Sequence, residues 1–92
     1  MVKTEKIDWI VYLFRCSDNS LYCGVTNNLD KRIAKHNEGT ASKYTRARLP
    51  VEIVAVKKDL TKSEAFKLEY RLKRLPAKKK ILFLTENCLS KA

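Results

Sequence analysis

Glycine and proline are scarce in this 92-residue sequence. Two glycines and two prolines are too few for a disordered or fibrous composition. The three cysteines, Cys16, Cys23 and Cys88, are an odd number without a Cys-x-x-Cys pair, and the chain has one histidine. A disulfide framework and a four-ligand zinc site therefore both fit poorly, and we expect small packed thiols.

Long apolar runs are also absent. The longest stretches, 9–14 and 81–84, fall far short of the roughly 18 residues that span a bilayer. The amino-terminal residues are charged and lack a small-residue cleavage site, which argues against a signal peptide. We expect no membrane span and a cytoplasmic protein.

Positive charge, in contrast, is abundant and unevenly distributed. Twenty basic side chains against ten acidic ones give a net charge of +10. Residues 43–92 hold fourteen basic and five acidic side chains, a net charge of +9, whereas residues 1–42 hold six and five, a net charge of +1. Such a field attracts polyanions, so nucleic acid is the first expected partner and an anionic membrane the second.

The length and the hydrophobic content of 45% predict one domain with a single core, over 1–92. Turn residues at 18–20 separate two aromatic and β-branched runs, which predicts an antiparallel hairpin. Asn27 or Asn28 is a suitable N-cap for the first helix, and Gly39 suits the position after its C-terminus. Residues 61–64 have the spacing of a capping box, which predicts the start of the second helix. The order is ββαβαα: strands at 9–14, 21–25 and 51–56, helices at 28–38, 61–75 and 77–84, a basic loop at 40–50 and a frayed tail at 85–92.

Two tyrosines, an arginine and a histidine are candidates for a site. Hairpin pairing would bring Tyr12 and Tyr22 to one end of the same sheet, although aromatics are also ordinary strand residues. Arg32 and His36 are separated by four residues and so lie on one helix face. His36 also falls on the apolar period, so a histidine at the edge of the core is the alternative.

Glu69 lies at the border of the apolar stripe of its predicted helix. A carboxylate at that position is costly unless something compensates its charge. It either pairs with Lys73 one turn later or binds a hard cation, because Mg²⁺ often takes only one or two protein carboxylates.

Basic residues with an interleaved aromatic predict a nucleic-acid surface. The segment 43–48 combines cations with Tyr44, as phosphate binding and base stacking require, and its alternative is a solvated loop. The residues expected to bind nucleic acid are Lys43, Tyr44, Arg46, Arg48, Lys73, Arg74, Lys78, Lys79 and Lys80.

Several of these segments resemble the motifs of the GIY-YIG nuclease superfamily, in its small stand-alone bacterial form. Ile10-Val11-Tyr12 and Tyr22-Cys23-Gly24 are similar to the two signature triplets, with Ile10 and Cys23 replacing the residues of the family name. The segments 28–37, 43–46 and 69–73 resemble the later motifs. The resemblance covers about 9–84 and implies an α+β fold with a three-stranded antiparallel sheet flanked by helices.

The resemblance also implies an activity, the hydrolysis of nucleic-acid phosphodiester bonds with one divalent metal, Mg²⁺ or Mn²⁺. By position, Tyr22 would activate the attacking water, with Tyr12 supporting it. Arg32 would stabilise the phosphate charge, His36 would assist proton transfer or positioning, and Glu69 would hold the metal.

We therefore expect a metal-dependent nuclease acting on DNA, in repair or processing. The alternative is an inactive nucleic-acid-binding module of the same fold. A third interpretation is an adaptor that uses 78–80 to bind an anionic membrane or an acidic protein.

Overall fold

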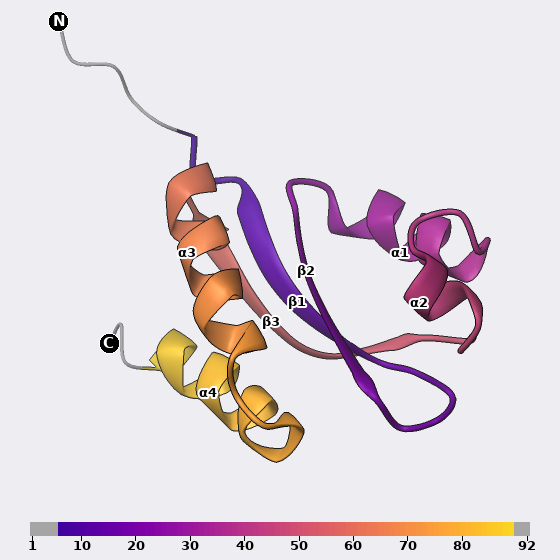
Figure 1. Ribbon diagram of the computed structural model, residues 1–92. Helices are drawn as coiled ribbons and strands as arrows, with labels where there is room; N and C mark the ends of the chain where they lie inside the picture. Colours follow the sequence, from indigo (N-terminus) through magenta and orange to yellow (C-terminus); the bar gives the residue numbers. More distant parts are fainter. Residues whose placement is uncertain (1–5, 90–92) are drawn as a thin grey trace, which may run out of the picture.

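The computed structural model describes residues 6–89 of the chain, and the side chains of residues 6–85. Three strands, β1 (Trp9–Arg15), β2 (Leu21–Thr26) and β3 (Glu52–Leu60), form an antiparallel sheet in the order β2-β1-β3. β1 and β2 are the predicted hairpin, and β3 pairs with the other edge of β1 (Figure 1).

Helices cover both faces of this sheet. α1 (Leu29–Asn37) and the short α2 (Lys43–Arg46) follow the hairpin, whereas α3 (Lys62–Lys73) and α4 (Ala77–Leu89) follow β3. Figure 1 shows the two pairs on opposite sides of the strands. The predicted fold class, α+β with a three-stranded antiparallel sheet flanked by helices, is confirmed. None of the helices in the described part of the chain has the length and apolar character needed to cross a membrane.

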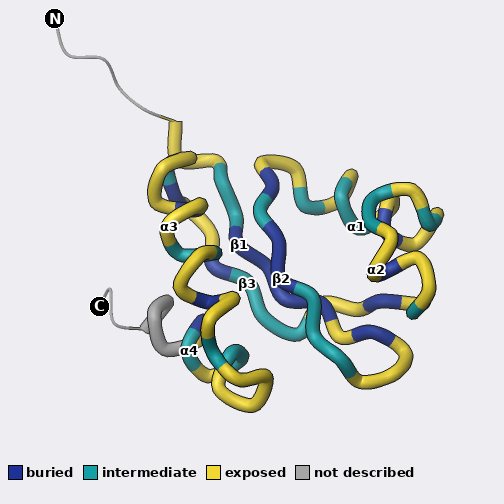
Figure 2. The backbone as a smooth tube through the Cα atoms, in the orientation of Figure 1, coloured by how far each residue is buried: buried dark blue, intermediate teal, exposed yellow. Residues whose placement is uncertain are grey.

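β1 is buried on both sides because it is the central strand between two layers. Val11 and Leu13 pack with residues of α3 and α4, while Tyr12 and Phe14 pack with residues of α1. All four side chains are buried, and the dark segment of β1 in Figure 2 marks this core. A central strand covered on both faces needs a continuous apolar run rather than an alternating one.

The predicted capping residues of α1 and α3 are confirmed. The Asn28 side chain accepts a hydrogen bond from the Lys31 amide at 3.2 Å and caps α1. Gly39, just beyond α1, has a φ of 82°, the left-handed conformation that favours glycine. Thr61 and Glu64 form both hydrogen bonds of a capping box at the start of α3.

Three segments differ from the prediction, and the observed order is ββααβαα. Residues 43–46 form α2 instead of part of a loop, because the Ser42 side chain accepts from the Tyr44 amide and caps a turn too short to show a period. β3 continues to Leu60 past a register shift against β1, where Asp59 has a φ of 62° and breaks the alternation. α4 continues to Leu89, so the expected tail is helical that far, and 90–92 lie outside the described residues.

Candidate active site

The two candidate tyrosines lie on the same face of the hairpin. Tyr12 is opposite Gly24 and Phe14 is opposite Tyr22, so the tyrosines are diagonal neighbours. The Tyr12 ring lies directly over Gly24, where a Cβ atom would collide with its hydroxyl and its Cζ atom. The glycine of the second triplet therefore makes room for the phenol of the first.

His36 fixes the Tyr12 hydroxyl from α1. The His36 ring is buried, and its Nε2 atom lies 3.3 Å from the Tyr12 oxygen. Its Nδ1 atom lies 2.8 Å from the Thr45 hydroxyl, which donates to the Ser42 carbonyl at 3.4 Å. Because that donation uses the only hydroxyl proton of Thr45, we assign the Nδ1 atom as the donor to Thr45 and Nε2 as the acceptor from Tyr12.

Burial and nearby charges decide the protonation of this pair. Burial, with the positive charge of Arg32, lowers the pKa of His36, so the imidazole is neutral at pH 7. Burial raises the pKa of the Tyr12 phenol, with a further contribution from Tyr22 and a smaller one from Glu69, while Arg32 opposes the shift. Tyr12 is therefore a protonated hydrogen-bond donor to a neutral imidazole.

Tyr22 belongs to a column of rings that leads from His36 to the surface. Its half-buried ring lies 5.2 Å from the His36 ring and stacks on Tyr44 at 5.9 Å, measured between centroids. The Arg48 guanidinium lies 3.9 Å from the Tyr44 centroid and forms an ion pair of 2.8 Å with Asp18 in the hairpin turn. Helix α2 therefore contacts Tyr22 through the Tyr44 ring.

Glu69 reaches the hairpin from α3. Its side chain is 18% exposed and forms the predicted ion pair with Lys73, at 3.2 Å. Its negative charge contributes to raising the pKa of Tyr12, and together with burial, the larger cause, it raises the pKa of the Cys23 thiol to about 12. Arg32 and Glu69 thus shift the pKa of Tyr12 in opposite directions.

The described side chains include no group of three or more histidine, cysteine, aspartate or glutamate residues suited to a metal ion. Glu69 remains the carboxylate for which a metal role is expected. A single carboxylate is compatible with Mg²⁺, which keeps several waters and is completed by substrate phosphate.

The residues expected to bind nucleic acid fall into two groups. The exposed ones are Lys43, Tyr44, Arg46, Lys73, Arg74, Lys78 and Lys79, whereas Arg48 and Lys80 are partly buried. Lys73 pairs with Glu69, and Arg74 donates to the Tyr70 hydroxyl at 3.0 Å. Arg48 is held by Asp18 and by the Tyr44 carbonyl, so its contacts are those of a structural residue.

Sequence reasoning missed the contribution of Thr45 and Asp18. Thr45 lies inside the quoted 43–46 motif, but only the fold shows that its hydroxyl meets His36. Asp18 was assigned to the turn alone, and its partner Arg48 lies 30 residues further along the chain. Neither contact has a signal in local spacing.

The chain belongs to the GIY-YIG family, a family of nucleases: the family model of the GIY-YIG catalytic domain matches residues 8–81. This range includes the two tyrosines, Arg32, His36 and Glu69, and the resemblance inferred from the motifs is confirmed.

Relatives and solved structures agree with this assignment. UPF0213 protein RBAM_000440 of Bacillus velezensis is 50% identical over 80 residues, which are 87% of this chain and 81% of the relative. UPF0213 protein YazA of Bacillus subtilis is 46% identical over the same shares of the two chains. The solution NMR structure of the protein EF2693 from E. faecalis superimposes with a TM-score of 0.61 at 35% identity, covering 97% of this chain and 93% of that one.

Proposed function

We propose that this protein is a divalent-metal-dependent nuclease that hydrolyses phosphodiester bonds in DNA, in repair or another form of DNA processing. The observation that carries the proposal is the position of the Tyr12 hydroxyl. It lies 3.3 Å from the Nε2 atom of His36, and the pKa of the phenol is lowered by Arg32 and raised by Glu69. A guanidinium and a carboxylate of one site are suited to a phosphate and a cation, respectively.

The two tyrosines take different roles in this proposal. Tyr12 is buried and hydrogen-bonded to His36. It is therefore a positioning residue that fixes the imidazole relative to the hairpin. Tyr22 is more accessible and is the phenol that would bind and activate the attacking water. The neutral His36 imidazole assists by accepting the hydrogen bond of the Tyr12 hydroxyl, which fixes the position of that proton.

Arg32 would bind the phosphate that is attacked. Its guanidinium cannot lose its proton and offers a planar fork of donors that fits phosphate oxygens. Because charge builds up on the phosphate in the transition state, a fixed cation there stabilises the transition state more than the ground state.

Glu69 would hold the metal, Mg²⁺ or Mn²⁺. Its carboxylate is mostly buried and ion-paired with Lys73 on the same helix, so its charge is held in place for a cation. When bound, the ion would polarise a phosphoryl oxygen and stabilise the leaving oxygen. Lys73 would then lie close enough to contact the substrate phosphate.

The charge distribution supports nucleic acid as the substrate. Lys43 and Arg46 are exposed on α2 beside the column of rings, and Lys78 and Lys79 are exposed at the start of α4. Contacts of this kind bind the backbone without reading the sequence. We therefore propose DNA binding with weak sequence preference.

The test is cleavage of labelled single-stranded, nicked and branched DNA with and without Mg²⁺. Wild type is compared with Glu69→Gln and with Glu38→Gln, a matched change of an exposed glutamate. We expect cleavage that needs Mg²⁺, is lost in Glu69→Gln and persists in Glu38→Gln. Cleavage that survives Glu69→Gln would refute the metal role, and wild-type binding without cleavage on every substrate would favour the inactive module.

A further inference from the structure

The outward side of α3 carries two exposed aromatic rings that the proposed catalytic site does not use. Phe66 is 47% exposed and Tyr70 is 63% exposed. They are four residues apart on one helix, so the rings start about 6 Å apart along its axis. Exposed aromatic side chains that adjoin one another mark interaction surfaces more often than isolated ones do.

Two open hollows meet at Phe66. One, of about 510 Å³, is lined by Lys6, Trp9, Lys62, Ser63 and Phe66. The other, of about 400 Å³, is lined by Phe66, Lys67, Tyr70 and Arg71. Because they share one residue, the hollows form a continuous surface along α3, which we call the α3 track: Trp9, Lys62, Phe66, Lys67, Tyr70 and Arg71.

Cations lie beside the rings of the track. The Phe66 ring lies 5.8 Å from the Trp9 ring, and the Lys62 ammonium lies 5.8 Å from the Trp9 centroid. Lys67 and Arg71 are exposed and, being four residues apart, form a row on α3 beside the row of Phe66 and Tyr70. Within the described part of the chain, no carboxylate lines either hollow. The surface is therefore both aromatic and positively charged.

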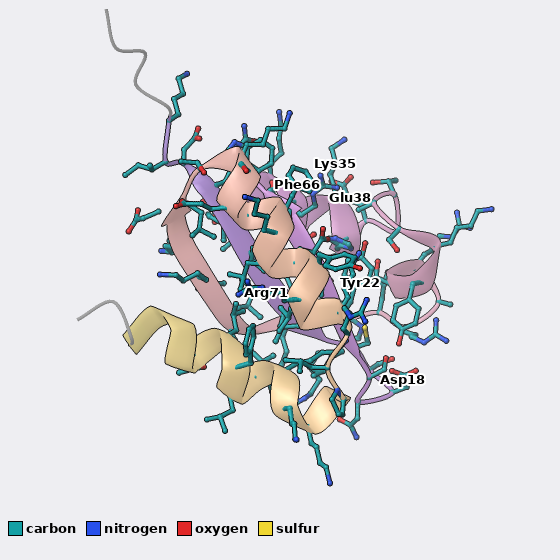
Figure 3. The ribbon with its side chains drawn as sticks, turned by 60° about the vertical axis from the view of Figure 1, so that its left-hand side comes forward. Asp18, Tyr22, Lys35, Glu38, Phe66 and Arg71 are labelled. Atoms are coloured by element: carbon teal, nitrogen blue, oxygen red, sulfur yellow. The ribbon has the colours of Figure 1, made fainter. Side chains whose placement is uncertain are left out.

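The carboxylates of α3 line neither hollow of the track. Glu64 is engaged in the capping box with Thr61, and Glu69 is engaged with Lys73. Glu69 is largely buried toward the hairpin although Tyr70, the next residue, is exposed. The track therefore begins next to Glu69, the proposed metal ligand, and runs past Phe66 toward the start of α3. Figure 3 labels Phe66 and Arg71 of the track, and Tyr22 of the hairpin.

We propose that the α3 track binds single-stranded nucleic acid outside the catalytic site. Unpaired bases stack on Phe66 and Tyr70, and the phosphates between them contact Lys67 and Arg71. Rings next to cations are the combination that single-strand binding uses, and every base offers a face for stacking. A duplex keeps its bases stacked inside, so it meets only the cations of the track.

The test is a fluorescence anisotropy titration of the full chain in EDTA, which separates binding from cleavage. The probes are an oligothymidylate, an oligouridylate and a mixed-sequence duplex of equal length, with vesicles of anionic phospholipid as a fourth arm. The variants are Phe66→Ala/Tyr70→Ala, the single Tyr70→Ala, and Phe66→Tyr/Tyr70→Phe, which keeps both rings. The matched control is Leu82→Ala, on α4, where the side chain is 59% exposed.

We expect the double alanine variant to bind the single strands about tenfold more weakly or worse, and the duplex nearly as well as wild type does. Tyr70→Ala loses part of that affinity, and the ring-retaining variant and Leu82→Ala lose none. The two oligonucleotides show whether the track prefers DNA or RNA. The proposal is overturned if wild type binds no single strand, if the alanine variants bind as wild type does, if duplex affinity falls equally, or if only vesicle binding falls. Because no step needs Mg²⁺, these outcomes are independent of whether the chain cleaves DNA.

Discussion

The Nδ1 atom of His36 lies 2.8 Å from the Thr45 hydroxyl oxygen, and both side chains are buried. This contact joins α1 to α2 and fixes the ring whose other nitrogen meets Tyr12. A four-residue helix thus holds the orientation of an imidazole in the candidate site.

Replacing Thr45 tests this positioning. Thr45→Val keeps the shape but leaves the buried Nδ1 proton of His36 without an acceptor, which costs about 1–3 kcal/mol in the free energy of unfolding. We expect cleavage to slow by about tenfold or more, since a general acid–base group contributes roughly 10²–10⁴. Urea unfolding and single-turnover cleavage measure the two effects. Thr45→Ser, which keeps the hydroxyl, should restore both, and an inactive serine variant would contradict the role.

The stability of the protein should depend on pH through His36. Its pKa is lowered in the folded state by burial and by Arg32, so the folded protein binds this proton less readily than the unfolded chain does. The unfolded state is therefore favoured as the pH falls below the ordinary histidine pKa of about 6.5, and this stability contribution is complete above it.

An NMR titration of the His36 ring proton from about pH 8 to about pH 5 measures this directly. We expect a midpoint below 6.5, together with a loss of unfolding free energy at acid pH that is smaller in His36→Gln. A midpoint at or above 6.5 would show that the imidazole is not held neutral.

Gly24 should tolerate no side chain while Tyr12 is present. A Cβ atom at this position collides with the Tyr12 ring, so we expect Gly24→Ala to lose about 1–3 kcal/mol of unfolding free energy and most of the cleavage activity. In a Tyr12→Ala background the same change should cost much less, because the two residues are coupled. Equal costs in both backgrounds, measured by urea unfolding, would show that the ring does not lie over the glycine.

The cations of the 43–48 segment should differ in their effect on DNA binding. Lys43 and Arg46 are exposed, whereas Arg48 is tied to Asp18 and Tyr44. We expect Lys43→Gln/Arg46→Gln to lower the slope of log affinity against log salt by about 1.8 on duplex DNA, two phosphate contacts. Arg48→Gln should leave the slope unchanged and cost about 1 kcal/mol or less in stability. If Arg48→Gln alone lowered the slope, Arg48 would contact a DNA phosphate and the structural role would be wrong.

Some of this structure could be predicted from the sequence because its signals are local. The run at 11–14 beside a turn predicts a buried strand of a hairpin, and Thr61 with Glu64 predicts a helix start. The sequence did not predict the extension of β3 to Leu60, because Asp59 is left-handed and interrupts the alternation of the strand. The partners of His36 and Arg48 come from distant segments and depend on tertiary packing.

The five candidate site residues were predicted on the ordered motifs of a family, since spacing alone left each with an ordinary alternative. For Glu69 the ion pair with Lys73 is confirmed, whereas the metal role stays a prediction. His36 is a buried histidine and a partner of the proposed site.

The most direct test of the central claim is a double-mutant cycle on single-turnover cleavage, with Arg32→Ala, Glu69→Gln and the combined variant. If the two charges serve one phosphodiester beside Tyr12, each single change slows cleavage by about 10²-fold or more, and the combined variant is little slower than the worse single one. Rate effects that multiply in full would contradict the claim, because they would mean that Arg32 and Glu69 act independently.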